Sequence, residues 1–320
     1  MGNTVQKMIK KGVLIAGGIF AFNTLYNKYA TRKHLLKASP ENYYNWKGLK
    51  VFYKKSGSGS PVLLLHSLHP AASSYEWELV ASSLCESHTV YMLDLPGCGR
   101  SDKPEMQYVY YDYIRLIRDF MESMKIPRAA IVASNLSAPI AVMAHAYNPA
   151  LISKLVLINP PSPEPVSKTP DVLDIVKYRA FTLPLIGAFI YNLLASRSQI
   201  DMAFSEKYFY NPFHDTDELV DLYFESAHIG NENGRYLTAC MYGNYLNMNM
   251  NRAICSLSVP TLIVEGRSIE GGEETLKKWK EQNPSIQTVL IEHTRQLPML
   301  EEPEITSDVI LQFIQEAAPV

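Results

Sequence analysis

The sequence predicts an α/β protein in which helices cover both faces of a mostly parallel sheet. Short apolar runs such as Pro61–Leu65 are typical of strands buried on both faces. These runs alternate with helical segments such as 109–124, where Tyr113, Ile117 and Phe120 recur at helical spacing. That alternation predicts a doubly wound sheet. The chain has 320 residues, of which 47% are hydrophobic and 19% charged, so it forms a large core and is not a disordered protein.

The predicted elements follow one another along the body of the chain. Strands are expected at 48–55, 61–65, 89–93, 129–133, 155–159, 261–265 and 288–291, and helices at 74–84, 109–124, 137–146 and 305–314. Residues 38–47 are predicted to be a short polar connector. Residues 163–252 interrupt the alternation with a long helical stretch rich in Tyr and Met, which predicts an inserted cap. We therefore expect an amino-terminal segment at 1–37, a core in two parts at 38–162 and 253–320, and a cap at 163–252.

The amino-terminal segment differs in character from the body. Gly12–Tyr26 contains only two polar residues, and the first 40 residues carry seven basic and no acidic side chains. As a helix this run covers about 22 Å, which is less than the roughly 30 Å hydrocarbon core of a bilayer. Flanking lysines such as Lys11 and Lys28 can reach the lipid headgroups. We predict a single membrane anchor through residues 12–27, with a cleaved signal peptide or a packed soluble helix as alternatives. Basic residues at both ends leave the membrane side undecided.

Charge and motif content limit the cofactors and partners. The formal net charge of −2 argues against a nucleic-acid partner. No phosphate-binding glycine loop is found, and we expect no cofactor. The cysteines form no CxxC pair and no metal-ligand spacing, so no metal site is predicted; their even number leaves disulfides open for Cys85, Cys98, Cys240 and Cys255.

Four motifs occur in an order that carries a family resemblance. His66-Ser67-Leu68 ends one strand, Asp94–Pro104 follows the next, Val259–Gly266 contains a late strand, and Leu297–Glu301 lies near the carboxyl terminus. With these motifs, the chain resembles the α/β-hydrolase superfamily over about residues 48–316. The resemblance implies a capped hydrolase fold. It also implies a pocket formed by His66, Ser67, Leu68 and Leu136, in which the N–H groups of Leu68 and Leu136 take the oxyanion-hole positions.

The catalytic positions implied by the resemblance hold the wrong residue types for hydrolysis. The family carries its nucleophile in a Gly-x-Ser-x-Gly turn, whereas this chain has Ala133–Ser137 there, with Asn135 in the place of the serine. Ile269 occupies the acid position and Gln296 the base position. A Ser-His-Asp system works as a unit. Three substitutions, one for each role, therefore predict that the whole triad has been lost.

Other residues near these positions keep a catalytic alternative open. Ser134 is the fallback nucleophile, Glu270 the fallback acid and His293 the fallback base. Our leading hypothesis is a membrane-tethered protein that binds a small apolar or amphipathic molecule, or a protein partner through its cap, without catalysis. The alternative is an active hydrolase of ester- or lipid-like substrates with an unorthodox site. A third possibility is a scaffold whose pocket has collapsed.

Overall fold

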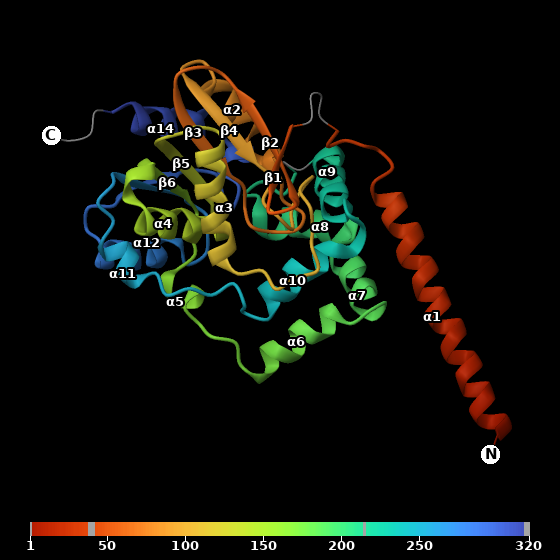
Figure 1. The fold of residues 1–320 in the computed structure, drawn as a ribbon. Helices are drawn as coiled ribbons and strands as arrows, with labels where there is room; N and C mark the ends of the chain where they lie inside the picture. Colours follow the sequence, from red (N-terminus) through yellow and green to blue (C-terminus); the bar gives the residue numbers. More distant parts are fainter. Residues whose placement is uncertain (1, 38–41, 214–215, 317–320) are drawn as a thin grey trace.

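An eight-stranded sheet forms the centre of the computed structural model, which describes residues 2–37, 42–213 and 216–316 (Figure 1). The strand order is β1-β2-β4-β3-β5-β6-β7-β8, with β1–β2 and β2–β4 antiparallel and all other neighbours parallel. The strands are β1 (Asn42–Trp46), β2 (Leu49–Ser56), β3 (Ser60–Leu65), β4 (His88–Leu93), β5 (Ala129–Ser134), β6 (Ile152–Ile158), β7 (Thr261–Gly266) and β8 (Gln287–Ile291). The predicted α/β fold with a mostly parallel sheet is therefore confirmed.

Helices pack on both faces of this sheet and divide the core in two. On one face, α3 (Tyr110–Ser123), α4 (Ala138–Tyr147) and α12 (Gly272–Gln282) contribute Phe120, Ile140 and Trp279 to the larger cluster. On the other face, α2 (Glu78–Leu84) and α14 (Pro303–Gln315) contribute Val80 and Phe313. The parallel strands are buried on both faces, which explains why they consist of unbroken apolar runs rather than alternating patterns.

One prediction about the start of the core is wrong. The connector expected at 38–47 contains β1, which pairs with β2 through a tight hairpin. Lys47 and Gly48 both have positive φ, +51° and +88°, as a two-residue hairpin turn requires. Trp46 is buried, and its Nε1 donates to Asp119 at 2.9 Å. The strand was missed because its polar Asn and Tyr residues lie on a half-exposed edge of the sheet.

A long helical segment separates β6 from β7. It contains α5 (Pro163–Val166), α6 (Val172–Thr182), α7 (Ile186–Leu194), α8 (Arg197–Ala203), α9 (Asp217–His228), α10 (Gly234–Tyr242) and α11 (Asn251–Cys255), with a π-helical turn at Phe204–Tyr208. In Figure 1, α6, α7 and α10 lie below and to the right of the sheet, whereas α11 lies beside α4 and α12 of the core. The helices from α5 to α11 form the segment predicted as the cap, whose limits of 163 and 252 stay a prediction. The predicted boundary at 37/38 falls beside residues 38–41, which lie outside the described residues.

The amino-terminal segment is one helix, α1 (Gly2–Ala30), longer than the predicted run. Its free end projects away from the body (Figure 1). Its carboxyl-terminal part packs on the cap: Asn23 Nδ2 donates to the Leu185 main-chain oxygen at 3.2 Å, and Asn27 Nδ2 donates to Glu232 at 2.8 Å. Among the described residues, Thr4–Ala30 is the one helix long and apolar enough to cross a membrane; signal sequences and buried helices meet the same criterion.

Candidate functional site

A strained turn lies at the carboxyl end of β5, at the centre of the sheet. Asn135 has φ +48°, a left-handed backbone that costs most residues free energy but that asparagine tolerates. β5 ends at Ser134, and Asn135–Ser137 form a short 3₁₀ turn that leads into α4. Ser137 is fully buried, and its hydroxyl donates to the main-chain oxygen of His66 at 2.6 Å. The turn therefore presents the half-buried Asn135 side chain at the end of the central strands.

Gln296 lies directly beside this turn, in the loop after β8. Asn135 Nδ2 donates to the Gln296 main-chain oxygen at 3.3 Å and to Ser134 Oγ at 3.1 Å. The Gln296 N–H donates to the Tyr208 main-chain oxygen of the cap at 3.0 Å. The Gln296 carboxamide and the Asn135 side-chain oxygen make no hydrogen bond with any residue that the structure describes. Both groups are therefore available to a ligand.

Asn159, at the end of β6, holds the Gln296 loop in place. Its Nδ2 donates to the main-chain oxygens of Arg295 and Gln296, both at 2.9 Å, and its Oδ1 accepts from the Gly266 N–H at 2.9 Å. Asn159 is buried and also has a positive φ of +46°. One side chain therefore joins the ends of β6 and β7 to the loop after β8. This role of Asn159 was not predicted, although an Asn directly after a buried strand was a visible signal in the sequence.

The three positions assigned to the triad meet around one cavity. Asn135, Ile269 and Gln296 all line a space of about 240 Å³ at the carboxyl ends of β5, β6 and β7. Ile269 is half-buried in the loop between β7 and α12. The structure thus brings together the three residues that the motif comparison placed in the site. None of the three side chains titrates near neutral pH.

Glu265 lies in the same cavity and was not predicted. It is the penultimate residue of β7, and only 2% of its surface is exposed. Burial raises the pKa of this carboxyl group to about 8, and its Oε2 has no hydrogen-bond partner. Glu265 therefore keeps its proton at neutral pH and adds no negative charge to the cavity. The signal in the sequence was a lone glutamate at the end of the apolar run Thr261–Val264.

The loop at the carboxyl end of β3 lines a second cavity beside the Asn135 turn. The Ser67 N–H donates to Glu76 Oε2 at 2.9 Å, and the Leu68 N–H makes no hydrogen bond among the described residues. The Leu136 N–H lies in the first turn of the 3₁₀ segment, where backbone donors lack helical partners. Ser67, Leu68 and Leu136 line one cavity of about 170 Å³. Two backbone donors are therefore placed where a polar group can accept from them.

His66 has a different role from the one predicted for it. Its side chain is fully buried, and it does not line this cavity. Its Nε2 accepts from the Leu95 N–H at 2.9 Å, and its Nδ1 lies 2.7 Å from the Ser67 main-chain oxygen. Burial lowers the pKa of His66, although the charge of Asp94 opposes this. The neutral ring therefore connects the loop after β3 to the loop after β4.

A buried carboxyl group forms part of the same cavity. Glu76 accepts from Tyr223 Oη at 2.9 Å as well as from the Ser67 N–H, and only 1% of its surface is exposed. Burial raises its pKa to about 7, although both hydrogen bonds act in the other direction. Tyr223 comes from α9 of the cap, so the contact fixes the cap against the β3 loop. Glu76 was not predicted, because its position in a helical segment looked like an ordinary surface charge.

The fallback residues do not form a second catalytic group. Ser134 is fully buried, and its hydroxyl accepts from Asn135. Glu270 is exposed in the loop before α12. His293 is exposed, and its ring lies 5.4 Å from that of Tyr210, measured between centroids. Neither Glu270 nor His293 lines the cavities around Asn135.

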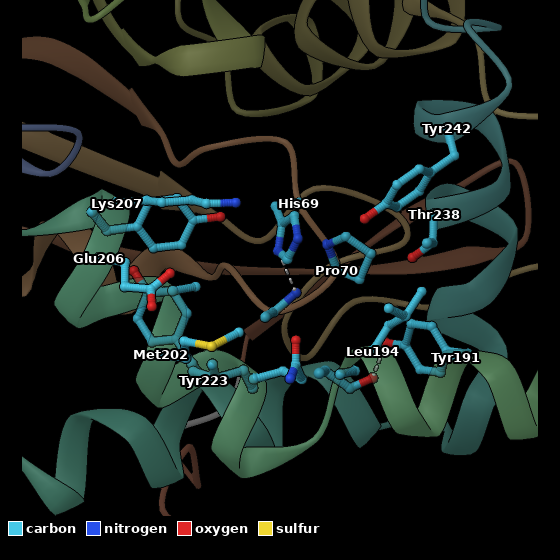
Figure 2. Close-up of a pocket in the computed structure, with 17 residues that line it drawn as sticks. His69, Pro70, Tyr191, Leu194, Met202, Glu206, Lys207, Tyr223, Thr238 and Tyr242 are labelled. Atoms are coloured by element: carbon cyan, nitrogen blue, oxygen red, sulfur yellow. Dashed lines mark hydrogen bonds between the residues drawn. The ribbon is translucent and has the colours of Figure 1, made fainter. Parts of the chain in front are cut away.

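A third cavity, of about 220 Å³, lies under the cap and adjoins the Leu68 cavity (Figure 2). The two share His69, Tyr208 and Tyr223. Figure 2 shows His69 at the centre, with Glu206 and Lys207 on one side and Tyr242 on the other. His69 Nδ1 accepts from the Ala71 N–H at 3.2 Å, and burial lowers the pKa of the ring to about 4. The ring is neutral at physiological pH, and because Nδ1 accepts a hydrogen bond, its proton is on Nε2.

Other reactive groups show no special arrangement. The cysteines are free, and Cys98 and Cys240 are buried. Within the described ranges, no group of three or more His, Cys, Asp and Glu side chains is close enough to hold a metal ion.

Comparison with known proteins places the chain in a family. The model for the alpha/beta hydrolase fold matches residues 60–303. A 2-hydroxy-6-oxo-6-(2'-aminophenyl)hexa-2,4-dienoic acid hydrolase of Metapseudomonas resinovorans is 25% identical over 285 residues, which are 88% of this chain and 92% of that protein. An uncharacterized protein of Mycobacterium bovis is 31% identical over 112 residues, so the match spans about a third of that relative: 32% of it and 35% of this chain.

Solved structures share the same architecture. A serine hydrolase of carbazole degradation superposes with a TM-score of 0.70 at 22% identity, covering 87% of this chain and 99% of its own. A membrane phospholipase A superposes with a TM-score of 0.67 at 19% identity over 98% of both chains. Since the family model matches most of the chain and the sheet has the same character, this protein belongs to the α/β-hydrolase fold family.

Proposed function

We propose that this protein is a membrane-tethered member of the family that binds a small apolar or amphipathic molecule without hydrolysing it. The observation that carries the proposal is Asn135 at the tip of the β5 turn. Its carboxamide replaces an activatable hydroxyl and bonds to the Gln296 backbone. No histidine lines the two cavities around Asn135 except His69, whose pKa is about 4. The histidine base of a Ser-His-Asp triad is therefore missing from the described lining of these cavities.

The cavities suit a ligand with an apolar body and a polar end. Leu68, Leu136 and Met241 line the cavity beside Asn135, and the cavity under the cap adds further apolar and aromatic side chains. At the polar end, the N–H groups of Leu68 and Leu136 donate, while the Gln296 carboxamide can donate and accept. Such a site recognises a neutral or anionic head group by hydrogen bonds.

The decisive experiment combines covalent labelling with binding. We expect the purified full-length protein to give no stoichiometric labelling with a serine-directed fluorophosphonate, and no burst with activated esters. A fluorescent fatty-acyl probe should nevertheless bind to it. Met241→Trp should weaken probe binding by at least about tenfold because the indole fills the cavity, whereas Leu79→Trp on the exposed face of α2 should not. Labelling of any serine would instead support an active hydrolase, and absence of binding would support a protein with no ligand.

A further inference from the structure

An unpartnered apolar surface extends over two helices of the cap. We call it the cap face; it consists of Val172, Leu173 and Val176 on α6 and Ile186, Leu193 and Leu194 on α7. Val172 is 76% exposed, Leu173 69% and Val176 59%. Single exposed apolar residues are ordinary, but six on two consecutive helices mark an interaction surface.

The interior contacts of α6 leave this face free. The helix packs on the cap through Phe181, whose ring stacks on Tyr242 with centroids 5.4 Å apart, and through Tyr178, whose ring lies 4.7 Å from that of Tyr245. Val172 and Val176 are four residues apart and lie one turn above the other on the outer side. Core packing therefore does not account for their apolar character.

The helix α1 leaves the protein surface next to α7. Phe22 contacts Phe189 edge-on with ring centroids 5.4 Å apart, and Asn192 Nδ2 donates to Asn23 Oδ1 at 3.0 Å. On the amino-terminal side of Phe22, the side chains of α1 are mostly exposed. Figure 1 shows that the free end of α1 points toward the side of the molecule on which α6 lies.

The length of the free apolar part of α1 determines how close the cap lies to the membrane in which α1 is anchored. Gly12–Phe22 has no charged residue and extends about 16 Å, whereas the hydrocarbon core of a bilayer is about 30 Å thick. The rest of the apolar run, Asn23–Tyr26, is packed against the cap. A spanning α1 therefore brings the part of the cap beside it down to the lipid.

We propose that the cap face docks on the lipid bilayer in which α1 is anchored. This inference rests on the membrane anchor of the proposed function. The chemistry agrees with a lipid surface, because the exposed guanidinium of Arg179 borders the cap face, as do the exposed ammonium groups of Lys168 and Lys177, which pair with Asp171 and Asp174. Apolar side chains flanked by basic ones are typical of helices that lie in the interface of anionic membranes.

Docking also fixes where the ligand enters. Leu194 belongs to the cap face and lines the cavity under the cap, together with the exposed Met202 and Tyr242. The docked face therefore turns the rim of this cavity toward lipid. A ligand that partitions into the membrane, such as an acyl-chain amphiphile, then reaches the cavity without crossing water.

The test measures lipid contact in the full-length protein. In a background with Cys85→Ser and Cys255→Ser, single cysteines are introduced by Val176→Cys on the cap face, Leu14→Cys on α1 and Leu79→Cys on α2 at the opposite end of the molecule. All three positions are exposed, so an environment-sensitive fluorophore fits at each. The labelled proteins are reconstituted into phosphatidylcholine–phosphatidylglycerol vesicles with and without nitroxide-bearing lipids.

The three probes separate the possible results. We expect lipid quenching at positions 176 and 14 to exceed that at 79 by about fivefold or more. Quenching at 14 with none at 176 would overturn docking while leaving the anchor intact. No quenching at either position would overturn the anchor as well. A probe at 176 that is shielded from water but not quenched by lipid, together with cross-linked dimers, would assign the cap face to a second copy of the chain.

Discussion

The side chain of Asn135 donates from Nδ2 to the main-chain oxygen of Gln296 across 3.3 Å. This bond joins the turn after β5 to the loop after β8, the two places to which the motif resemblance assigns the nucleophile and the base. The backbone at position 135 keeps the left-handed conformation of that turn, with φ +48°. The turn and the loop are therefore held together by a contact between two residues that do not ionise near neutral pH.

Restoring the three residue types should create esterase activity. We expect Asn135→Ser, Ile269→Asp and Gln296→His together to hydrolyse an activated short-chain ester at least about tenfold faster than any single variant, because triad members act as a unit. The backbone donors at Leu68 and Leu136 are already in place. The measurement is the initial rate with a p-nitrophenyl ester.

The matched control carries Asn135→Ala in place of Asn135→Ser with the other two changes kept. It should remain at background, because it has a base and an acid but no nucleophile. A well-folded restored variant that is no faster than this control would show either that one of the three assignments is shifted by a residue, first of all Ile269 against Glu270, or that the pocket is closed over the turn.

Asn159 should be critical for stability because its single side chain satisfies three main-chain groups. We expect Asn159→Ala to lower the free energy of unfolding by about 3 kcal/mol, since it leaves buried polar groups unpaired. Asn159→Gly, which accepts the φ of +46°, separates backbone strain from the lost hydrogen bonds. Asn231→Ala is the control, because Asn231 is exposed, has a similar φ of +60°, and makes no side-chain hydrogen bond among the described residues; it should lower stability by only about 1 kcal/mol through backbone strain. Equal unfolding curves for Asn159→Ala and Asn231→Ala would contradict this role.

Glu265 should make stability depend on pH in a predictable direction. Its folded pKa of about 8 lies above the ordinary value of 4.5, so the folded state holds a proton that the unfolded state releases between these values. Its contribution is fully present below about pH 4.5 and is lost as the pH rises through 8. Glu265→Gln does not titrate, so its stability relative to wild type should rise by on the order of 4 kcal/mol between about pH 5 and pH 9. Denaturant unfolding of both proteins at both pH values measures this; a constant difference would mean that Glu265 is already ionised in the folded protein.

The packing of the carboxyl-terminal part of α1 on the cap should depend on two buried asparagines, Asn23 and Asn27. Replacing both, Asn23→Ala with Asn27→Ala, removes three hydrogen bonds to the cap and should lower stability by about 2 kcal/mol. Amide hydrogen exchange in residues 23–30 should become faster, while the protein still fractionates with membranes. Thr24→Ala is the control, because Thr24 is bonded only within its own helix. Equal amide exchange rates in the double variant and in Thr24→Ala would show that these hydrogen bonds do not hold α1 on the cap.

Local sequence patterns were sufficient for most of the fold. Strands buried on both faces, such as 61–65, consist of unbroken apolar residues, and this pattern needs no knowledge of neighbours. The strand Asn42–Trp46 escaped prediction because an edge strand alternates polar and aromatic side chains, and only its pairing with β2 makes it a strand. The same limit applied to α1, whose apolar run was visible while its contacts with Leu185 and Glu232 were not.

The sequence by itself determined the fold family, because its motifs occur in a fixed order along the chain. The same motifs selected Asn135, Ile269 and Gln296, which line one cavity, and their assignment to the three catalytic positions stays a prediction. Only the tertiary structure decided which other groups share the site. Glu76, Asn159 and Glu265 are far apart in the chain, and the parallel strands and the cap bring them to the same edge of the sheet. The physical reason is that burial and hydrogen-bond partners come from distant segments. They set the pKa of a carboxyl group, and no local pattern records them.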